Sequence, residues 1–224
     1  VLPFLLNVIL EFCTFAHSTA NWALFERTFS FWEALVKTFE EIPSLLSASS
    51  AKVLQFVALL FRATEVPRNI SRRSEEMEDF EKFSVCARDI LNLYASVLGI
   101  DQMLCLLLQY CSSATAGSNI IQLRNAIQTV KAMAKELNSS TLFPQCLAFF
   151  HSAYQQQLLS SSEKVSILSC HFLLLSKIAK WFSAQPAELL MREFGLLQSI
   201  LLESSEGILL QDALIALKAL LGSC

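Results

Sequence analysis

The stretch Val165–Phe182, with the sequence VSILSCHFLLLSKIAKWF, decides the fold class of this chain of 224 residues. Its apolar residues recur at helical spacing, and they form two stripes instead of one. One stripe is Leu168, Phe172, Leu175, Ala179 and Phe182, and the other is Ile167, His171, Leu174, Ile178 and Trp181. A helix with two apolar stripes is buried on two sides, so we expect this helix to lie between neighbouring helices.

The same helical spacing extends from this stretch toward both ends of the chain. The predicted helices span roughly residues 1–17, 20–42, 46–63, 77–98, 101–113, 119–137, 141–157, 162–183, 186–203 and 208–222. Alternate helices begin near residues 20, 77, 119, 162 and 208, so the last three steps are about 42–46 residues. HEAT and armadillo repeats have a period of ~40–47 residues.

We therefore predict an all-α fold, an α-α superhelix of the HEAT or armadillo type with about ten antiparallel helices. An irregular helical bundle is the alternative. The chain is expected to be a single solenoid segment, residues 1–224, of a larger protein, because it begins with Val1 and has no basic leader. Residues 64–77 are predicted to be an inserted charged loop, which explains the longer first step.

Composition excludes several other classes of protein. With only five glycines and five prolines, few tight turns can form, which argues against a sheet-rich fold. Hydrophobic residues make up 54% of the chain, but the apolar runs are short or interrupted, so no membrane-spanning helix is predicted. A net charge of −3 gives no general attraction to nucleic acid. The seven cysteines show no paired short spacing, which is typical of buried thiols in a reducing compartment.

One segment departs from this apolar composition. Residues 65–89 hold twelve charged side chains, seven of them acidic. We predict that the densest acidic cluster binds a basic partner; it consists of Glu75, Glu76, Glu78, Asp79 and Glu81. The alternative is a solvated loop followed by a helix N-terminus, whose dipole favours acidic residues.

The sequence gives little support to catalysis. The three histidines, His17, His151 and His171, lie in separate apolar contexts, and none has a second ligand at metal-binding spacing. His171 is expected to be a core or edge histidine. Gly-rich phosphate loops and the Gly-x-Ser-x-Gly motif are absent. We therefore predict no enzymatic activity, no cofactor and no metal.

The run from Phe25 to Leu35 holds a recognisable set of residues, Glu26, Thr28, Phe29, Phe31, Trp32 and Leu35. This run resembles a helix of the karyopherin-β nuclear transport receptors, in the transportin-SR and importin-thirteen branch. Further similarity lies in Glu78-Asp-Phe-Glu-Lys-Phe, in the helix from Ala126 to Lys135, in Ser169–Trp181 followed by Gln185-Pro, and in Ala213–Cys224.

The resemblance implies a central HEAT-repeat segment of a nuclear import receptor. Its partners would be Ran GTPase in the GTP form, protein cargo and phenylalanine-glycine nucleoporins, with no nucleic acid and no membrane insertion. The protein would move between cytoplasm and nucleus. A HEAT-repeat scaffold or adaptor outside nuclear transport, such as a phosphatase or coat-type subunit, is the alternative, and an enzyme with an unrecognised site is a third.

Overall fold

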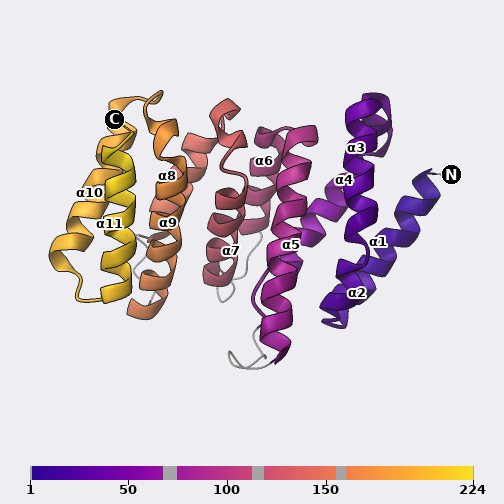
Figure 1. Ribbon diagram of the computed structural model, residues 1–224, viewed down its shortest axis with the longest axis horizontal. Coiled ribbons are helices and arrows are strands. Elements are labelled where there is room, and N and C mark those ends of the chain that lie inside the picture. Colours follow the sequence, from indigo (N-terminus) through magenta and orange to yellow (C-terminus); the bar gives the residue numbers. More distant parts are fainter. Residues whose placement is uncertain (1, 68–74, 113–118, 155–159, 224) are drawn as a thin grey trace. The chain divides into compact units, whose positions relative to one another are not determined.

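The computed structural model describes residues 2–67, 75–112, 119–154 and 160–223. These residues form helices and no β-strand, so the predicted all-α class is confirmed (Figure 1). The helical pattern predicts one solenoid segment, and the structure divides the chain into two compact units, Val1–Tyr110 and Cys111–Cys224. Each unit is described by itself below.

The first unit is built from paired helices. Its helices are α1 (Leu2–Ser18), α2 (Trp22–Glu26), α3 (Phe29–Glu41), α4 (Pro43–Ala63), α5 (Glu75–Leu98) and most of α6 (Ile100–Ser112). Helix α1 packs against α4, and both α2 and α3 pack against α5. Helices that are not consecutive in the chain therefore lie side by side, as expected for stacked helix pairs.

Aromatic side chains fill the core of the first unit. The Trp32 and Phe56 rings stack with centroids 3.6 Å apart and an angle of 9° between their planes. The Tyr94 hydroxyl donates a hydrogen bond of 3.2 Å to the Trp32 carbonyl oxygen, which ties α5 to α3. A second cluster places Phe83 of α5 against Trp22, Phe25 and Phe29.

The predicted helix over residues 20–42 is wrong as one element, because it is divided into α2 and α3. The division lies at Arg27 and Thr28, where the Thr28 hydroxyl donates to the Phe25 carbonyl oxygen at 2.8 Å. Such a side-chain bond to the preceding turn competes with the helical backbone pattern and bends the chain. The next helix begins earlier than predicted, since Pro43 is its first residue and favours that position.

The second unit holds α7 (Asn119–Ala132), the 3₁₀-helix η1 (Glu136–Ser139), α8 (Phe143–Tyr154), α9 (Ser161–Phe182), α10 (Ala187–Glu203) and α11 (Gly207–Leu221). Helix α9 packs against α7 on one side and α11 on another. Both of its apolar stripes are buried, which confirms the predicted two-sided burial. Helices α7, α9 and α11 begin at 119, 161 and 207, so the predicted period holds within this unit.

A capping box fixes where α9 begins. The Ser160 hydroxyl accepts a hydrogen bond from the Glu163 backbone N–H, and the Glu163 carboxylate accepts one from the Ser160 backbone N–H. Two N–H groups that the helix itself leaves unpaired are thereby satisfied. These two backbone N–H groups at the start of α9 therefore have side-chain partners.

Helices α4 and α9 are long and apolar enough to cross a membrane by length and composition alone. This corrects the expectation that no segment qualifies, which considered uninterrupted apolar runs and not the average over a whole helix. Within the second unit, protein contacts account for the apolar residues of α9, more than half of which are buried.

Candidate functional site

The predicted partner-binding residues lie on the first two turns of α5. All five are exposed, whereas Met77 and Phe80 between them face the core. We call this surface the acidic face of α5, and it consists of Glu75, Glu76, Glu78, Asp79 and Glu81. Asp79 makes an ion pair of 3.6 Å with Lys82, but both side chains are about 70% exposed, so the pair contributes little to stability.

Two residues of the acidic face, Glu75 and Glu76, are helical where a loop was predicted. Helix α5 begins at Glu75, so the loop predicted over 64–77 is too long at its end. Residues 68–74 of that loop lie outside the described residues. Three glutamates in the first turn favour the earlier start, because negative charge is stabilised at a helix N-terminus. The five carboxylates are consequently held on a regular scaffold.

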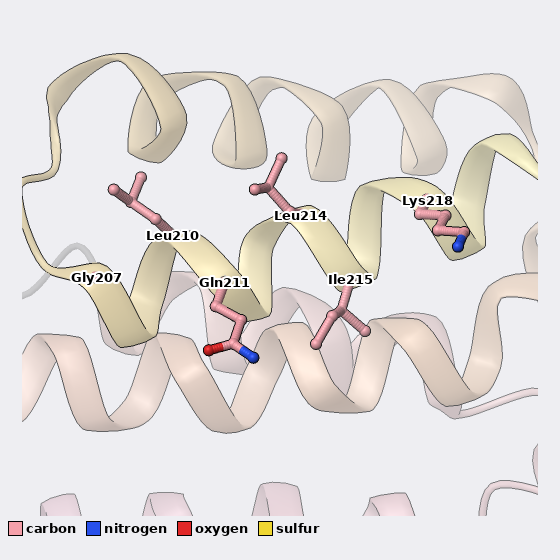
Figure 2. A pocket seen from close by; sticks show the side chains of 6 residues that line it. All are labelled: Gly207, Leu210, Gln211, Leu214, Ile215 and Lys218. Carbon is pink, nitrogen blue, oxygen red and sulfur yellow. The ribbon is translucent and has the colours of Figure 1, made fainter.

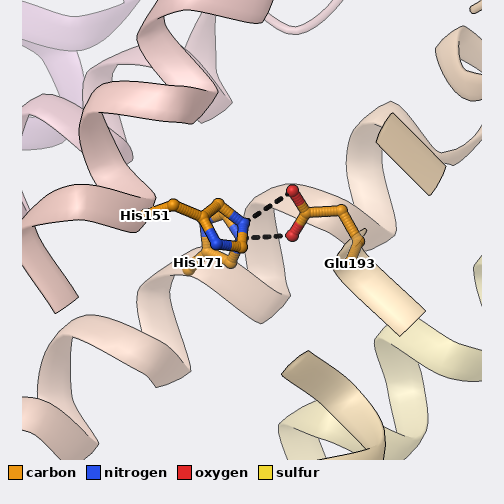
Figure 3. A group of neighbouring side chains, drawn as sticks. All are labelled: His151, His171 and Glu193. Atoms are coloured by element: carbon orange, nitrogen blue, oxygen red, sulfur yellow. Dashed lines mark hydrogen bonds and ion pairs between the residues drawn. The ribbon is translucent and has the colours of Figure 1, made fainter. Parts of the chain in front are cut away.

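A second group of ionisable side chains meets in the second unit, where the sequence shows no ligands at metal-binding spacing. His151 of α8, His171 of α9 and Glu193 of α10 converge from three different helices (Figure 3). The His151 Nε2 atom lies 2.7 Å from the Glu193 Oε1 atom, and the His171 Nε2 atom lies 2.9 Å from Oε2. We call these three residues the histidine–glutamate cluster.

The cluster is almost fully enclosed. The side chains of His171 and Glu193 are 0% exposed, and that of His151 is 12% exposed. The two imidazole rings stand edge to face, with centroids 5.4 Å apart. Arg192 is the nearest cation, with its Nη2 atom 3.5 Å from the Glu193 Oε1 atom. A buried carboxylate is therefore held between two imidazoles, with one guanidinium beside it.

Burial and hydrogen bonding act in opposite directions on this cluster. Burial by itself would raise the pKa of Glu193, but hydrogen bonds from His151 and His171 outweigh it and lower that pKa to about 2. Burial lowers the pKa of His171, and its bond to Glu193 only partly opposes this. Glu193 is therefore a carboxylate at neutral pH, whereas His171 is driven toward its neutral form.

These charge states determine what the cluster can do. An ionised carboxylate can only accept hydrogen bonds, so both Nε2 atoms must carry a proton in this arrangement. A neutral imidazole that donates from Nε2 keeps its lone pair on Nδ1, so the bond to Glu193 does not by itself prevent it from accepting a proton. The cluster offers three donor atoms of the kinds that bind metal ions, all within 4.8 Å of one another.

We expect the second unit to lose stability as the pH falls. The folded-state pKa values of His171 and Glu193 both lie below their ordinary values of 6.5 and 4.5. The unfolded chain then binds more protons, so stability decreases from about pH 6.5 downward and again below about pH 4.5. Hydrogen exchange of the α9 amides between pH 7 and pH 4 measures this directly.

Burial also lowers the pKa of His17 in α1, so the stability of the first unit should depend on pH as well. A variant of His17 therefore serves as the control in the same measurement. His17→Gln should reduce the pH dependence of exchange in α1 and leave that of α9 unchanged. Exchange in α9 that does not vary with pH, after correction for the intrinsic rate, would contradict the assigned charge states.

A shallow hollow of about 420 Å³ lies along α11. Figure 2 shows Leu210 and Leu214 pointing to one side of this helix and Gln211 and Ile215 to the other. Its lining offers one charged group, Lys218, and no pair of ionisable groups for acid–base chemistry. We therefore regard it as an exposed apolar surface and not as a catalytic pocket.

No disulfide forms among the cysteines that the structure describes. Of the six cysteines that the structure describes, Cys13, Cys111 and Cys146 are buried, so the predicted burial is confirmed for these three. Cys86 and Cys170 are partly exposed and Cys105 is exposed, so it is wrong for them. Comparison of the chain with protein-family models, with curated proteins and with solved structures gives no significant match.

Proposed function

We propose that this chain is a protein-binding segment of a nuclear import receptor that carries cargo through the nuclear pore under Ran-GTP control. The observation that carries the proposal is the acidic face of α5, which presents five exposed carboxylates on two turns of one helix. Paired helices supply a regular frame for such a surface. The proposed partners are Ran-GTP, protein cargo and phenylalanine-glycine nucleoporins, and the proposed localisation is the cytoplasm and nucleus.

The residues behind the family resemblance divide into two groups. Phe29, Trp32, Phe80 and Phe83 are buried, so this part of the resemblance concerns how helix pairs pack. Glu78 and its acidic neighbours are exposed and add nothing to the core. Binding is therefore assigned to the exposed group, because only those side chains are available to a partner.

The negative charge of the acidic face of α5 determines which kind of partner it attracts. Five carboxylates close together attract a basic protein surface and accelerate its approach, and they disfavour acidic partners. The attraction acts between exposed groups, so added salt should weaken it. A GTPase or cargo with a basic contact surface fits this requirement.

Exposed apolar side chains are the proposed contacts for the phenylalanine-glycine nucleoporins. Helix α1 exposes Phe4, Phe12 and Phe15, and α11 exposes Leu214 and Ile215. Several large apolar side chains exposed on one helix are typical of protein interaction sites. Phenylalanine side chains of nucleoporin repeats are suitable ligands for it.

Reversal of the acidic face should weaken partner binding. The variant combines Glu75→Lys, Glu76→Lys, Glu78→Lys, Asp79→Lys and Glu81→Lys. Replacing attraction by repulsion at five sites should reduce binding of Ran-GTP or basic cargo at least ~10-fold at low salt, mainly through the association rate. Surface plasmon resonance at two salt concentrations measures both the affinity and the association rate.

A control variant matches the change in charge at scattered positions. It combines Glu33→Lys, Glu40→Lys, Glu41→Lys, Glu203→Lys and Glu206→Lys, all of them at exposed sites. This variant should retain most of the affinity. Equal loss in both variants would remove the acidic face from the mechanism, and equal binding of the GTP and GDP forms of Ran would favour a scaffold outside nuclear transport.

A further inference from the structure

We propose that the histidine–glutamate cluster is a binding site for a transition-metal dication, with Zn²⁺ as the natural occupant. This inference does not depend on the transport proposal, because the cluster lies in the second unit and the acidic face of α5 lies in the first. The structure assigns three ligand atoms, Nε2 of His151, Nε2 of His171 and a carboxylate oxygen of Glu193.

The ligand chemistry favours zinc over the hard cations. Two imidazole nitrogens and one carboxylate oxygen form one of the ligand sets that zinc uses, whereas calcium and magnesium prefer oxygen ligands. Three helices provide the three ligands, so their separation is fixed by helix packing and not by a loop. A fourth position could be taken by a water molecule on the side of His151, which is the only cluster member with any exposure.

The three ligand atoms lie within 4.8 Å of one another, and a metal ion would require the side chains to adjust. Zinc bonds of ~2.0–2.1 Å at tetrahedral angles would place neighbouring ligand atoms roughly 3.4 Å apart. The two imidazole-to-carboxylate separations are now 2.7 and 2.9 Å. These two contacts end on different oxygens of Glu193. For a metal ion bound through one oxygen, the imidazole on that oxygen would move out by roughly half an ångström, and the other imidazole would turn toward the same oxygen. Each imidazole would shift its proton from Nε2 to Nδ1, so that Nε2 can donate its lone pair.

The positive charge of Arg192 disfavours a metal ion in the cluster, but the position of its guanidinium allows it to move away. Its guanidinium lies beside Glu193 but is 34% exposed, and the separation of 3.5 Å is long. The Nε and Nη2 atoms of Arg192 are buried without a hydrogen bond. Two nitrogen atoms of the Arg192 side chain thus lack hydrogen bonds in this position. Movement toward solvent would let water bind to them and would take a positive charge away from the metal site.

The test is a titration of chelator-treated, reduced protein with Zn²⁺ by calorimetry and with Co²⁺ by visible absorption. We expect one equivalent of Co²⁺ to give the intense visible bands of four-coordinate cobalt. His151→Gln should weaken Zn²⁺ binding at least tenfold, because it removes a ligand at the edge of the core where folding is least affected. Arg192→Gln should strengthen binding several-fold, because it removes a repelling charge.

His17→Gln provides the matched control, since it removes a half-buried histidine from the other unit and should leave binding unchanged. Far-UV circular dichroism verifies that each variant is folded. Absence of binding in the wild-type protein would overturn the proposal. So would equal affinity in His151→Gln, or a near-ultraviolet thiolate band showing that cysteines hold the cobalt. In those cases the cluster is a hydrogen-bonded structural group alone.

Discussion

Glu193→Ala is expected to destabilise the second unit by about 3 kcal/mol in the absence of metal. The change removes two hydrogen bonds to a charged acceptor, each worth ~1.5–3 kcal/mol, and leaves two imidazole N–H groups facing a cavity. Part of this loss is offset, because a buried carboxylate no longer has to be desolvated. Hydrogen exchange of the α9 amides measures the loss as a lower free energy of local opening.

Two further variants of α10 test that explanation. Glu193→Gln keeps the volume and one acceptor, so we expect a loss smaller than that of Glu193→Ala. Glu188→Ala removes an exposed carboxylate from the same helix and should change stability by less than ~0.5 kcal/mol. If Glu193→Ala behaved like Glu188→Ala, the cluster would make no net contribution to folding.

The fold class was predictable because the dominant signal is local. Apolar residues that recur every three or four positions define a helix wherever they occur, and α9 carries that signal on two faces. The predicted helix boundaries are wrong where a single side-chain contact determines whether a helix continues. Thr28 divides one predicted helix by bonding to the Phe25 carbonyl, and its hydroxyl alone does not reveal which of several possible bonds it makes.

The acidic face of α5 was found because charge clustering is visible in the sequence itself. The predicted helix over 77–98 already includes Glu78, Asp79 and Glu81, and only Glu75 and Glu76 were placed in a loop, because glutamates also occur commonly there. The helix dipole favours acidic residues near a helix N-terminus, but it does not specify at which residue the helix begins.

The histidine–glutamate cluster was missed because its members are distant in sequence. His151 and Glu193 are separated by 42 residues, and three different helices bring them to His171. Motif searches look for ligands a few positions apart and cannot detect such a group. One signal was present. His171 lies inside an apolar stripe, and a buried imidazole requires a polar partner from a neighbouring helix.

Trp32→Ala is expected to be the most destabilising single substitution in the first unit, with a loss of about 3–5 kcal/mol. The Trp32 side chain is fully buried between α4 and α5, where it stacks on Phe56 and meets the edge of Tyr94. Removing the indole leaves a large cavity and also loses the favourable aromatic pairing, worth ~0.5–1.5 kcal/mol beyond the buried area. Hydrogen exchange of the α3 and α5 amides should show the loss in both helices, because the cavity opens between them.

The neighbouring aromatic residue provides the control for this prediction. Phe31 lies on the same helix but is only half-buried, so Phe31→Ala should cost about 1 kcal/mol. Tyr94→Phe should also cost about 1 kcal/mol, because it removes only the hydrogen bond to the Trp32 carbonyl. Trp32→Ala is expected to cost most because it removes a whole buried ring, whereas Tyr94, although equally buried, loses only its hydroxyl and Phe31 is partly exposed. A loss in Trp32→Ala no larger than that in Phe31→Ala would mean that α3 does not pack on α4 and α5 through this side chain.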